Sequence, residues 1–472
     1  ADWLKRQGRR TSPPSAMAAR LPRLLQLAAL AAALSSVAAE HAAADPALPA
    51  VAPAPSLAPR RAPEADLPCL ETGQQEPALS LRQLRATALR DAAPPPSAVG
   101  LFEAAGSDWF TDLFGFAEGP SYAETKQRLR VRAGQQPGEQ VIQSSVNGAS
   151  YSVGSFFTPS LGGLRQWARA DGVSAPRELL PGTLRLSVEF GDVSAKIADP
   201  QNRNATFQVA SQFNCLEFVS PSVTPERGIT GYVHDKTQGP ACAMACGAAT
   251  AYRNYFAPTP ADNETGAAGG EGQLADRQVD NLRELSQALG NHPPGRFFEV
   301  EGGYTIAGTE AMAALGAKLA ALDEAELDAL RAKLHVCLQA DAQVTSSDWG
   351  RSRVRDQQQK VTQVFASAAS VAYNSGPASA WTRFAKLVLE ASYEATFWAA
   401  VRTARRHPGS AGARRLFLTQ LGGGAFGNER GWIVGAMRRA LGLFEGTDLD
   451  VRIVVYSPPV DSELQELLQQ FS

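Results

Sequence analysis

A glycine-rich loop near the C-terminus carries the clearest chemical signal in the chain. It runs from Gly422 to Gly427 and follows an apolar stretch, 416–421, that predicts a buried strand. A helix is expected to start near Asn428, because apolar residues recur beyond it at helical spacing. Such a unit gathers free backbone N–H groups and the positive end of a helix dipole around one point. The loop therefore predicts a phosphate site, and the alternative is a tight turn that only requires the conformational freedom of glycine.

A second candidate binding segment lies in the middle of the chain. The apolar run 207–210 predicts a strand, and the polar residues Gln212 and Asn214 follow it. Their side-chain amides could bind the hydroxyl groups of a ligand, although such residues also bond their own backbone in turns. The chain then passes through Gly239 and Pro240 into a helix of small residues, where a proline in the first turn costs no hydrogen bond.

Several neighbouring side chains have both a chemical and a structural interpretation. Glu217 is a candidate general base, and the alternative is an ion pair with Arg253 or a turn cap. Asp235 and Lys236 are predicted to form a structural ion pair. Phe426, inside the glycine-rich loop, either packs on a ligand or anchors the loop in the core.

Two pairs of helical residues have similarly open interpretations. Tyr252 and Tyr255 could stack on a nucleobase, but tyrosines three residues apart on a helix usually pack in the core. Glu390 and Glu394 lie one turn apart on the longest predicted helix, 377–405, and a solvated face is the favoured interpretation.

Composition excludes some classes of function. A formal net charge of −2 over 472 residues provides no general attraction for nucleic acid, and no partnership with nucleic acid is expected. The five histidines are scattered without a zinc-binding pattern, so no metal site is predicted. The odd number of cysteines, five, argues against a fully paired disulfide framework, and Cys242 and Cys246 have the helical spacing of core residues.

The N-terminal hundred residues differ in composition from the rest. Residues 1–16 precede the first methionine and are expected to lie outside the working protein, and 17–44 has the charge and apolar pattern of a signal peptide. Residues 45–99, rich in alanine and proline, are expected to be a disordered linker. These segments predict a secreted or secretory-pathway protein without a stable membrane span. The alternative is that a two-part leader directs the protein to an organelle. Asn204 and Asn263 then become possible glycosylation acceptors.

The folded body is expected to start near residue 107. Alternating residues predict a hairpin at 141–157, turning at Asn147-Gly148, and a second hairpin at 296–306. Segment 193–197 is expected to be a strand. Segments 273–289 and 323–339 are expected to be helices.

The two candidate loops together resemble macrodomains, the ADP-ribose-binding fold, loosely of the poly(ADP-ribose) glycohydrolase type. The chain order is the same: a strand that ends near an Asn, a loop into a helix rich in small residues, and a late strand, glycine-rich loop, helix and strand. The matched segments are 205–255 and 414–456. The first loop is Gln-Gly-Pro-Ala where the family has a glycine triplet, and the Gln-Glu-Glu motif of the glycohydrolases is absent, so the resemblance supports binding better than hydrolysis.

The resemblance implies a ligand-binding site made by both loops. In the first loop it would comprise Gln212, Asn214, Thr237, Gln238, Gly239 and Ala241, with Glu217 as the catalytic candidate. In the second loop it would comprise Gly422, Gly423, Gly424, Ala425, Phe426, Gly427 and Asn428. No cofactor is implied.

The fold class is therefore expected to be α/β, a three-layer macrodomain-like mixed sheet with helices on both faces. Residues 100–200 would form a β-rich N-terminal extension, and 201–472 the macrodomain-like domain with a helical insertion at about 270–405. The expected function is binding of ADP-ribose, a related nucleotide diphosphate or an ADP-ribosylated protein, with hydrolysis of an ADP-ribosyl linkage as a further activity. The alternative is a non-catalytic scaffold or protein-interaction module on a degenerate macrodomain-like fold.

Overall fold

The structure is a computed structural model, which describes residues 108–170, 172–173, 175–260, 269–292 and 295–471. The predicted signal peptide, the predicted linker and the acceptor Asn263 lie outside the described residues. Within the described ranges, no helix combines the length and apolar character needed to cross a membrane.

A nine-stranded mixed sheet forms the centre of the described part. Its strands, in spatial order, are β1 Leu129–Ala133, β2 Gln140–Ser144, β3 Ser150–Phe157, β10 Cys337–Gln343, β13 Lys360–Ala366, β5 Thr206–Ala210, β14 Arg415–Leu418, β15 Asp450–Val455 and β4 Arg185–Phe190. Neighbours from β1 to β13 are antiparallel, whereas neighbours from β13 to β4 are parallel. The central parallel strands β5 and β14 are buried on both faces, which is the pattern expected of strands covered by helices on two sides.

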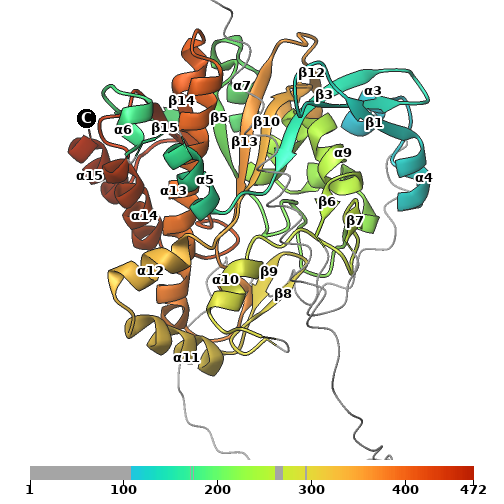
Figure 1. Cartoon of the computed structure of the whole chain (residues 1–472). Coiled ribbons are helices and arrows are strands. Elements are labelled where there is room, and N and C mark those ends of the chain that lie inside the picture. Colours follow the sequence, from blue (N-terminus) through green and yellow to red (C-terminus); the bar gives the residue numbers. More distant parts are fainter. Residues whose placement is uncertain (1–107, 171, 174, 261–268, 293–294, 472) are drawn as a thin grey trace, which may run out of the picture. The chain divides into compact units, whose positions relative to one another are not determined.

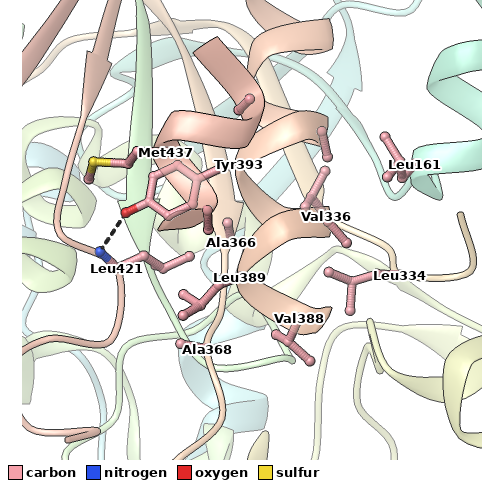
Figure 2. Close-up of a cluster of buried hydrophobic side chains, with 14 of the residues drawn as sticks. Leu161, Leu334, Val336, Ala366, Ala368, Val388, Leu389, Tyr393, Leu421 and Met437 are labelled. Atoms are coloured by element: carbon pink, nitrogen blue, oxygen red, sulfur yellow. Dashed lines mark hydrogen bonds between the residues drawn. The ribbon is translucent and has the colours of Figure 1, made fainter. Parts of the chain in front are cut away.

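One face of the sheet is covered by a hydrophobic layer built around the long helix α13. Its helices are α5 Leu161–Ala170, α6 Pro176–Leu179, α10 Arg283–Ala288, α11 Thr309–Ala320, α12 Glu324–Arg331, α13 Thr382–Arg406, α14 Arg430–Leu443 and α15 Ser462–Phe471. Figure 2 shows part of this layer, where Leu389 and Tyr393 of α13 meet Ala366 of β13 and Met437 of α14. The apolar stripe predicted for the long helix is therefore core.

The opposite face is covered by a second hydrophobic layer. Its helices are α3 Trp109–Phe114, α4 Tyr122–Gln127, α7 Val193–Ala198, α8 Gln238–Ala245 and α9 Gly247–Tyr255. Figure 1 shows α13 and α14 on one side of the sheet and α9 and α3 on the other. The predicted three-layer α/β arrangement, a mixed sheet with helices on both faces, is confirmed.

Three two-stranded hairpins complete the described strands. They are β6 Pro258–Thr259 with β7 Gly270–Glu271, β8 Glu299–Glu301 with β9 Tyr304–Ile306, and β11 Ser346–Ser347 with β12 Ser352–Arg353. The β2–β3 and β8–β9 hairpins confirm the predictions for 141–157 and 296–306. Within the predicted extension, β1 to β3 and β4 join opposite ends of the same sheet.

Three predicted elements are wrong. Residues 193–197 belong to helix α7, because the Asp192 side chain accepts a hydrogen bond from the backbone N–H of Ser194 and caps the helix. Helix 323–339 ends early, and Cys337 starts strand β10 in the middle of the sheet. Helix 273–289 is reduced to α10, because Gln273 is buried and bonds the backbone carbonyls of Asn214 and Arg253 instead.

A buried ion-pair network joins the helices of the first layer. Glu394 of α13 is 3 % exposed, and its carboxylate accepts hydrogen bonds from Arg165 of α5 at 2.6 Å and from Arg439 of α14 at 2.7 Å. Glu390, one turn earlier, pairs with Arg331 of α12. The favoured interpretation of these two acids as a solvated face is therefore wrong for Glu394.

A disulfide crosses the middle of the molecule. Cys215, in the loop after β5, is bonded to Cys337 at the start of β10, and their Cα atoms lie 6.2 Å apart. Cys242 and Cys246 are free and buried in the second layer. One disulfide is therefore present although the number of cysteines is odd.

Candidate functional site

The candidate site lies where strands β5 and β14 end side by side. The two strands pair only at Thr206–Leu416 and Phe207–Phe417, and they diverge beyond these pairs. Gln238 satisfies the β5 backbone beyond these pairs, because its side-chain oxygen accepts from the N–H of Ala210 and its side-chain nitrogen donates to the carbonyl of Gln208. Both candidate loops therefore start from the same edge of the sheet.

The chain leaves these two strands toward opposite faces. After β5 it reaches α8 in the second layer, and after β14 it reaches α14 in the first layer. Neighbouring parallel strands whose connections diverge in this way form a crevice at their carboxyl ends, which is the usual ligand site of open α/β sheets. The N-caps Thr237 of α8 and Glu429 of α14 make no side-chain capping hydrogen bond, so both helix starts leave backbone N–H groups without side-chain acceptors.

The second loop is a tight turn with exposed N–H groups. Gly422 and Gly427 have φ angles of 74° and 71°, in the left-handed region that favours glycine. Among the described residues, none accepts a hydrogen bond from the N–H of Gly424, Ala425 or Phe426. Gly424 and Ala425 are exposed. The turn can therefore present three backbone donors to an anion.

Asn428 holds this turn in place through hydrogen bonds and is not the N-cap of the helix that follows. Its side-chain nitrogen donates to the carbonyl of Ala369 at 2.8 Å, and its backbone N–H donates to the carbonyl of Gly422. Helix α14 begins at Arg430 with Glu429 as the N-cap. The helix start expected near Asn428 is therefore confirmed, although Glu429 is the N-cap and the Asn428 side chain bonds the loop that follows β13.

Phe426 points into an aromatic cluster between the two loops. Its ring centroid lies 5.2 Å from that of Tyr304 and 5.7 Å from that of Tyr373. The hydroxyl of Tyr304, on the β8–β9 hairpin, donates to the carbonyl of Phe218 at 2.5 Å and so reaches the first loop. The structure thus supports the core-anchor interpretation of Phe426, and the inserted hairpin links both sides of the crevice.

Gln212 and Asn214 are occupied by hydrogen bonds inside the protein. The side chain of Gln212 donates to the carbonyl of Phe218 and accepts from its N–H. Asn214 is 1 % exposed, and its side-chain nitrogen donates to Gln278 at 2.7 Å and to the carbonyl of Gly302 at 2.9 Å. Both side chains hold the first loop in place, and contact with a ligand would require the β8–β9 hairpin to move.

Glu217 is buried beside the start of α8. It is 2 % exposed, and no described residue donates a hydrogen bond to either of its carboxylate oxygens. The Cβ that an alanine at Gly239 would add lies 3.0 Å from Glu217 Cγ, so the side chain lies against the first turn of α8. Arg253 forms a buried ion pair with the carboxylate at 3.7 Å, which confirms the pairing with Arg253 given as the alternative from the sequence. The distance exceeds that of a hydrogen bond, and the attraction only partly offsets the desolvation. Burial raises the pKa of Glu217 to about 8.

The residues just before α8 do not pair as predicted. Asp235 accepts a hydrogen bond from the N–H of Thr237 at 3.0 Å, and burial raises its pKa. No ion pair joins it to Lys236, whose ammonium lies over the indole of Trp349 instead. Thr237 is exposed, whereas Gly239 and Ala241 are buried where α8 enters the fold.

Two exposed aromatic side chains at this edge were missed in the sequence analysis. Tyr456, directly after β15, is 78 % exposed, and Phe190, the last residue of β4, is 42 % exposed. Val455 pairs with Phe190, so both rings stand at neighbouring strand ends on the edge that carries the two loops. The stacking candidates Tyr252 and Tyr255 are instead buried in the second layer, at 4 % and 1 % exposure. An aromatic residue directly after a predicted parallel strand is the signal that could have located Tyr456.

Solved structures of poly(ADP-ribose) glycohydrolases are similar to this chain. That of the enzyme from Thermomonospora curvata has 13 % identity and a TM-score of 0.33, covering 67 % of this chain and 85 % of that one. That of the enzyme from Deinococcus radiodurans in complex with ADP-ribose has 12 % identity and a TM-score of 0.33, covering 74 % and 100 %. These are the class of proteins that the sequence resembles. No family model matches the chain, and no curated protein matches it.

The donor set at this edge consists of backbone N–H groups, amides and two acids with raised pKa values. Over the residues that the structure describes, no group of three or more His, Cys, Asp or Glu side chains is arranged to hold a metal ion. The arrangement can bind an anion and donate a proton.

Proposed function

We propose that this protein binds ADP-ribose, or a related nucleotide diphosphate, along the carboxyl edge of β4, β15, β14 and β5. One observation carries the proposal. Strands β5 and β14 are adjacent and parallel, but the helices that follow them, α8 and α14, lie on opposite faces of the sheet, and neither helix has a side-chain N-cap. A diphosphate is the ligand group that such a crevice suits, because backbone N–H groups and helix dipoles favour negative charge.

The order of the other ligand groups follows from the side chains along the edge. The exposed rings of Tyr456 and Phe190 provide a surface on which a purine can stack. The turn from Gly422 to Gly427 lies on the next strand and would receive the diphosphate. The distal ribose would then lie over the end of β5, near Asn214, after the diphosphate has passed the start of α8. From β4 to β5 the edge spans three strand spacings, about 14 Å.

Hydrolysis of an ADP-ribosyl linkage is the finer part of the proposal. With a pKa of about 8, Glu217 is mostly protonated at neutral pH, which suits a proton donor better than the general base predicted from the sequence. We expect Glu217→Gln to abolish release of ADP-ribose from an ADP-ribosylated protein while ADP-ribose binding persists. An unchanged rate of release would remove Glu217 from the mechanism.

Titration calorimetry of the full chain with ADP-ribose tests the binding proposal. Ala425 is exposed in the turn of the second loop, so a carboxylate placed there would repel the diphosphate without disturbing the core. We expect the wild type to bind, Ala425→Asp to lose binding, and the matched uncharged variant Ala425→Asn to retain it, with equal melting temperatures.

Two outcomes would contradict the proposal. The first is the absence of binding heat in the wild type at high ligand concentration, which would favour the non-catalytic scaffold. The second is equal affinity in Ala425→Asp and Ala425→Asn, which would place the diphosphate away from this turn.

A further inference from the structure

Lys236 is a cation at the start of α8. It directly precedes the N-cap Thr237, and its side chain is exposed. Among the described residues, no carboxylate lies within ion-pair distance of its ammonium group. The adjacent Asp235 carboxylate is directed to the N–H of Thr237. The positive charge of Lys236 therefore adds to that of the helix start.

The Lys236 side chain is directed by Trp349. Its Nζ lies 4.8 Å from the centroid of the Trp349 ring, within the range of a cation–π interaction. The indole N–H in turn donates to Asp192 at 2.5 Å, so the ring is fixed between the starts of α7 and α8. A lysine held over an aromatic face has fewer conformations to lose when it binds a ligand.

The backbone at Trp349 indicates that this position is costly to maintain. Asp348, Trp349 and Gly350 have consecutive positive φ angles of 49°, 57° and 83°. A left-handed conformation is unfavourable at a residue other than glycine and is retained only where the surroundings impose it. Here the turn packs against α3, because a Cβ added at Gly350 would lie 2.8 Å from Trp109 Cβ.

A second observation at the same helix start also indicates a ligand. The carboxylate of Glu217 is 2 % exposed and lies against Gly239 in the first turn of α8, with neither oxygen accepting a hydrogen bond from a described residue. Arg253 pairs with this carboxylate at 3.7 Å but leaves both oxygens without a hydrogen bond from a described residue, and buried polar atoms in that state are rare. The start of α8 therefore combines backbone donors, the Lys236 ammonium group and an acid whose oxygens can still take part in hydrogen bonds.

This inference rests on the proposed function. We propose that Lys236 neutralises the diphosphate of the ligand where the diphosphate passes the start of α8. Trp349 is the positioning residue that holds the Lys236 ammonium group there. The ligand would thus receive backbone donors from the second loop and a side-chain charge from the first. Neither residue takes part in a chemical step.

The experiment measures ADP-ribose affinity of the full chain by calorimetry at low and at high salt, with adenosine as a probe that lacks phosphate. We expect Lys236→Met to weaken ADP-ribose binding about tenfold, the loss of one charge-assisted contact, and to reduce the salt dependence. Lys236→Arg should restore both. Adenosine affinity should not change, and Lys386→Met, at an exposed lysine of α13, is the matched control.

Variants of Trp349 separate positioning from support of the fold. Trp349→Leu removes the aromatic face and should reduce affinity and salt dependence toward the values of Lys236→Met. Trp349→Phe keeps a face and should recover part of both, although each variant loses the bond to Asp192. A purely structural role would lower the melting temperature in both variants and leave the salt dependence unchanged.

The outcomes distinguish this inference from the function on which it rests. A wild type that does not bind ADP-ribose removes both. A wild type that binds, with Lys236→Met equal to it in affinity and salt dependence, removes only the role of Lys236. A loss of adenosine affinity equal to the loss of ADP-ribose affinity would also contradict it, because the phosphates would then not be the group that Lys236 contacts.

Discussion

Glu217 is an acid that the fold keeps away from water. The loop after β5 turns it under the start of α8, where Arg253 lies close but makes no hydrogen bond to it. Burial is therefore the largest influence on the pKa of Glu217, which is raised to about 8. A carboxyl group in this state affects stability as well as chemistry.

The dependence of stability on pH should report this group. Between pH 4.5, its ordinary pKa, and pH 8, the acid is ionised in the unfolded chain but protonated in the folded one, so stability falls as pH rises. Glutamine has a similar shape and cannot ionise. The unfolding free energy of Glu217→Gln should therefore match that of the wild type near pH 4.5. Toward pH 8 it should exceed the wild-type value by roughly 1.4 kcal/mol more for each pH unit. Urea unfolding across this range measures it.

The same substitution at the exposed Glu301 is the matched control for this prediction. A stability difference between Glu217→Gln and the wild type that is constant with pH would show that Glu217 is already ionised in the folded chain.

At the scale of elements, helix α13 holds the second loop in position. The hydroxyl of Tyr393 donates to the carbonyl of Thr419 at 2.6 Å and accepts from the N–H of Leu421 at 3.0 Å, the second of which Figure 2 shows. Both partners lie just before Gly422, where the chain turns. The long helix thus sets the entrance of the glycine turn.

Tyr393→Phe tests this support. The change leaves a buried carbonyl and a buried N–H without their partner, so we expect a loss of about 1–3 kcal/mol in unfolding free energy. Amide exchange should increase from Leu421 to Gly427, while the packing of the ring is kept. Tyr373→Phe is a suitable comparison, because the Tyr373 hydroxyl donates to the carbonyl of Val219 at 3.5 Å instead of bonding the backbone just before Gly422. Exchange that rises equally in both variants would contradict the support assigned to Tyr393.

The elements that the sequence predicted well are those with local signals. The glycine turn, the β8–β9 hairpin and helix α8 with its early Pro240 follow from turn chemistry and spacing. Strand β10 was missed because Cys337 and its neighbours form an apolar run that fits a helix equally well, and only its neighbours β3 and β13 decide the outcome. Trp349 and Tyr304 could not be placed for the same reason, since distant segments bring them to the edge of the sheet.

At the scale of the whole described part, the disulfide joins the first loop to the middle of the sheet. Cys215 lies one residue after Asn214, and its partner Cys337 lies 122 residues further along the chain. Asn281 also bonds to both sulfur atoms, which fixes the insertion to the same point. The bond therefore links the loop, the insertion and the sheet.

Removing this bond should destabilise the fold. For Cys215→Ala with Cys337→Ala we expect a loss of about 2–5 kcal/mol, because the crosslink closes a long loop in the unfolded chain. Urea unfolding of the wild type with and without reductant should reproduce the loss. Cys242→Ala, at a buried free thiol, is the control and should keep the effect of the reductant. Identical curves with and without reductant would show that the bond does not form.

The order of strands across the sheet has a consequence for how the protein matures. Thr206 of β5 pairs with Thr362 of β13 and with Leu416 of β14, so the central strand leaves the ribosome well before either neighbour exists. A chain with such a high contact order folds slowly, and the unpaired β5 must avoid other partners during this wait. The crevice becomes complete only after synthesis has passed β14, so products truncated before β14 would carry the first loop without a counterpart and should be prone to aggregation.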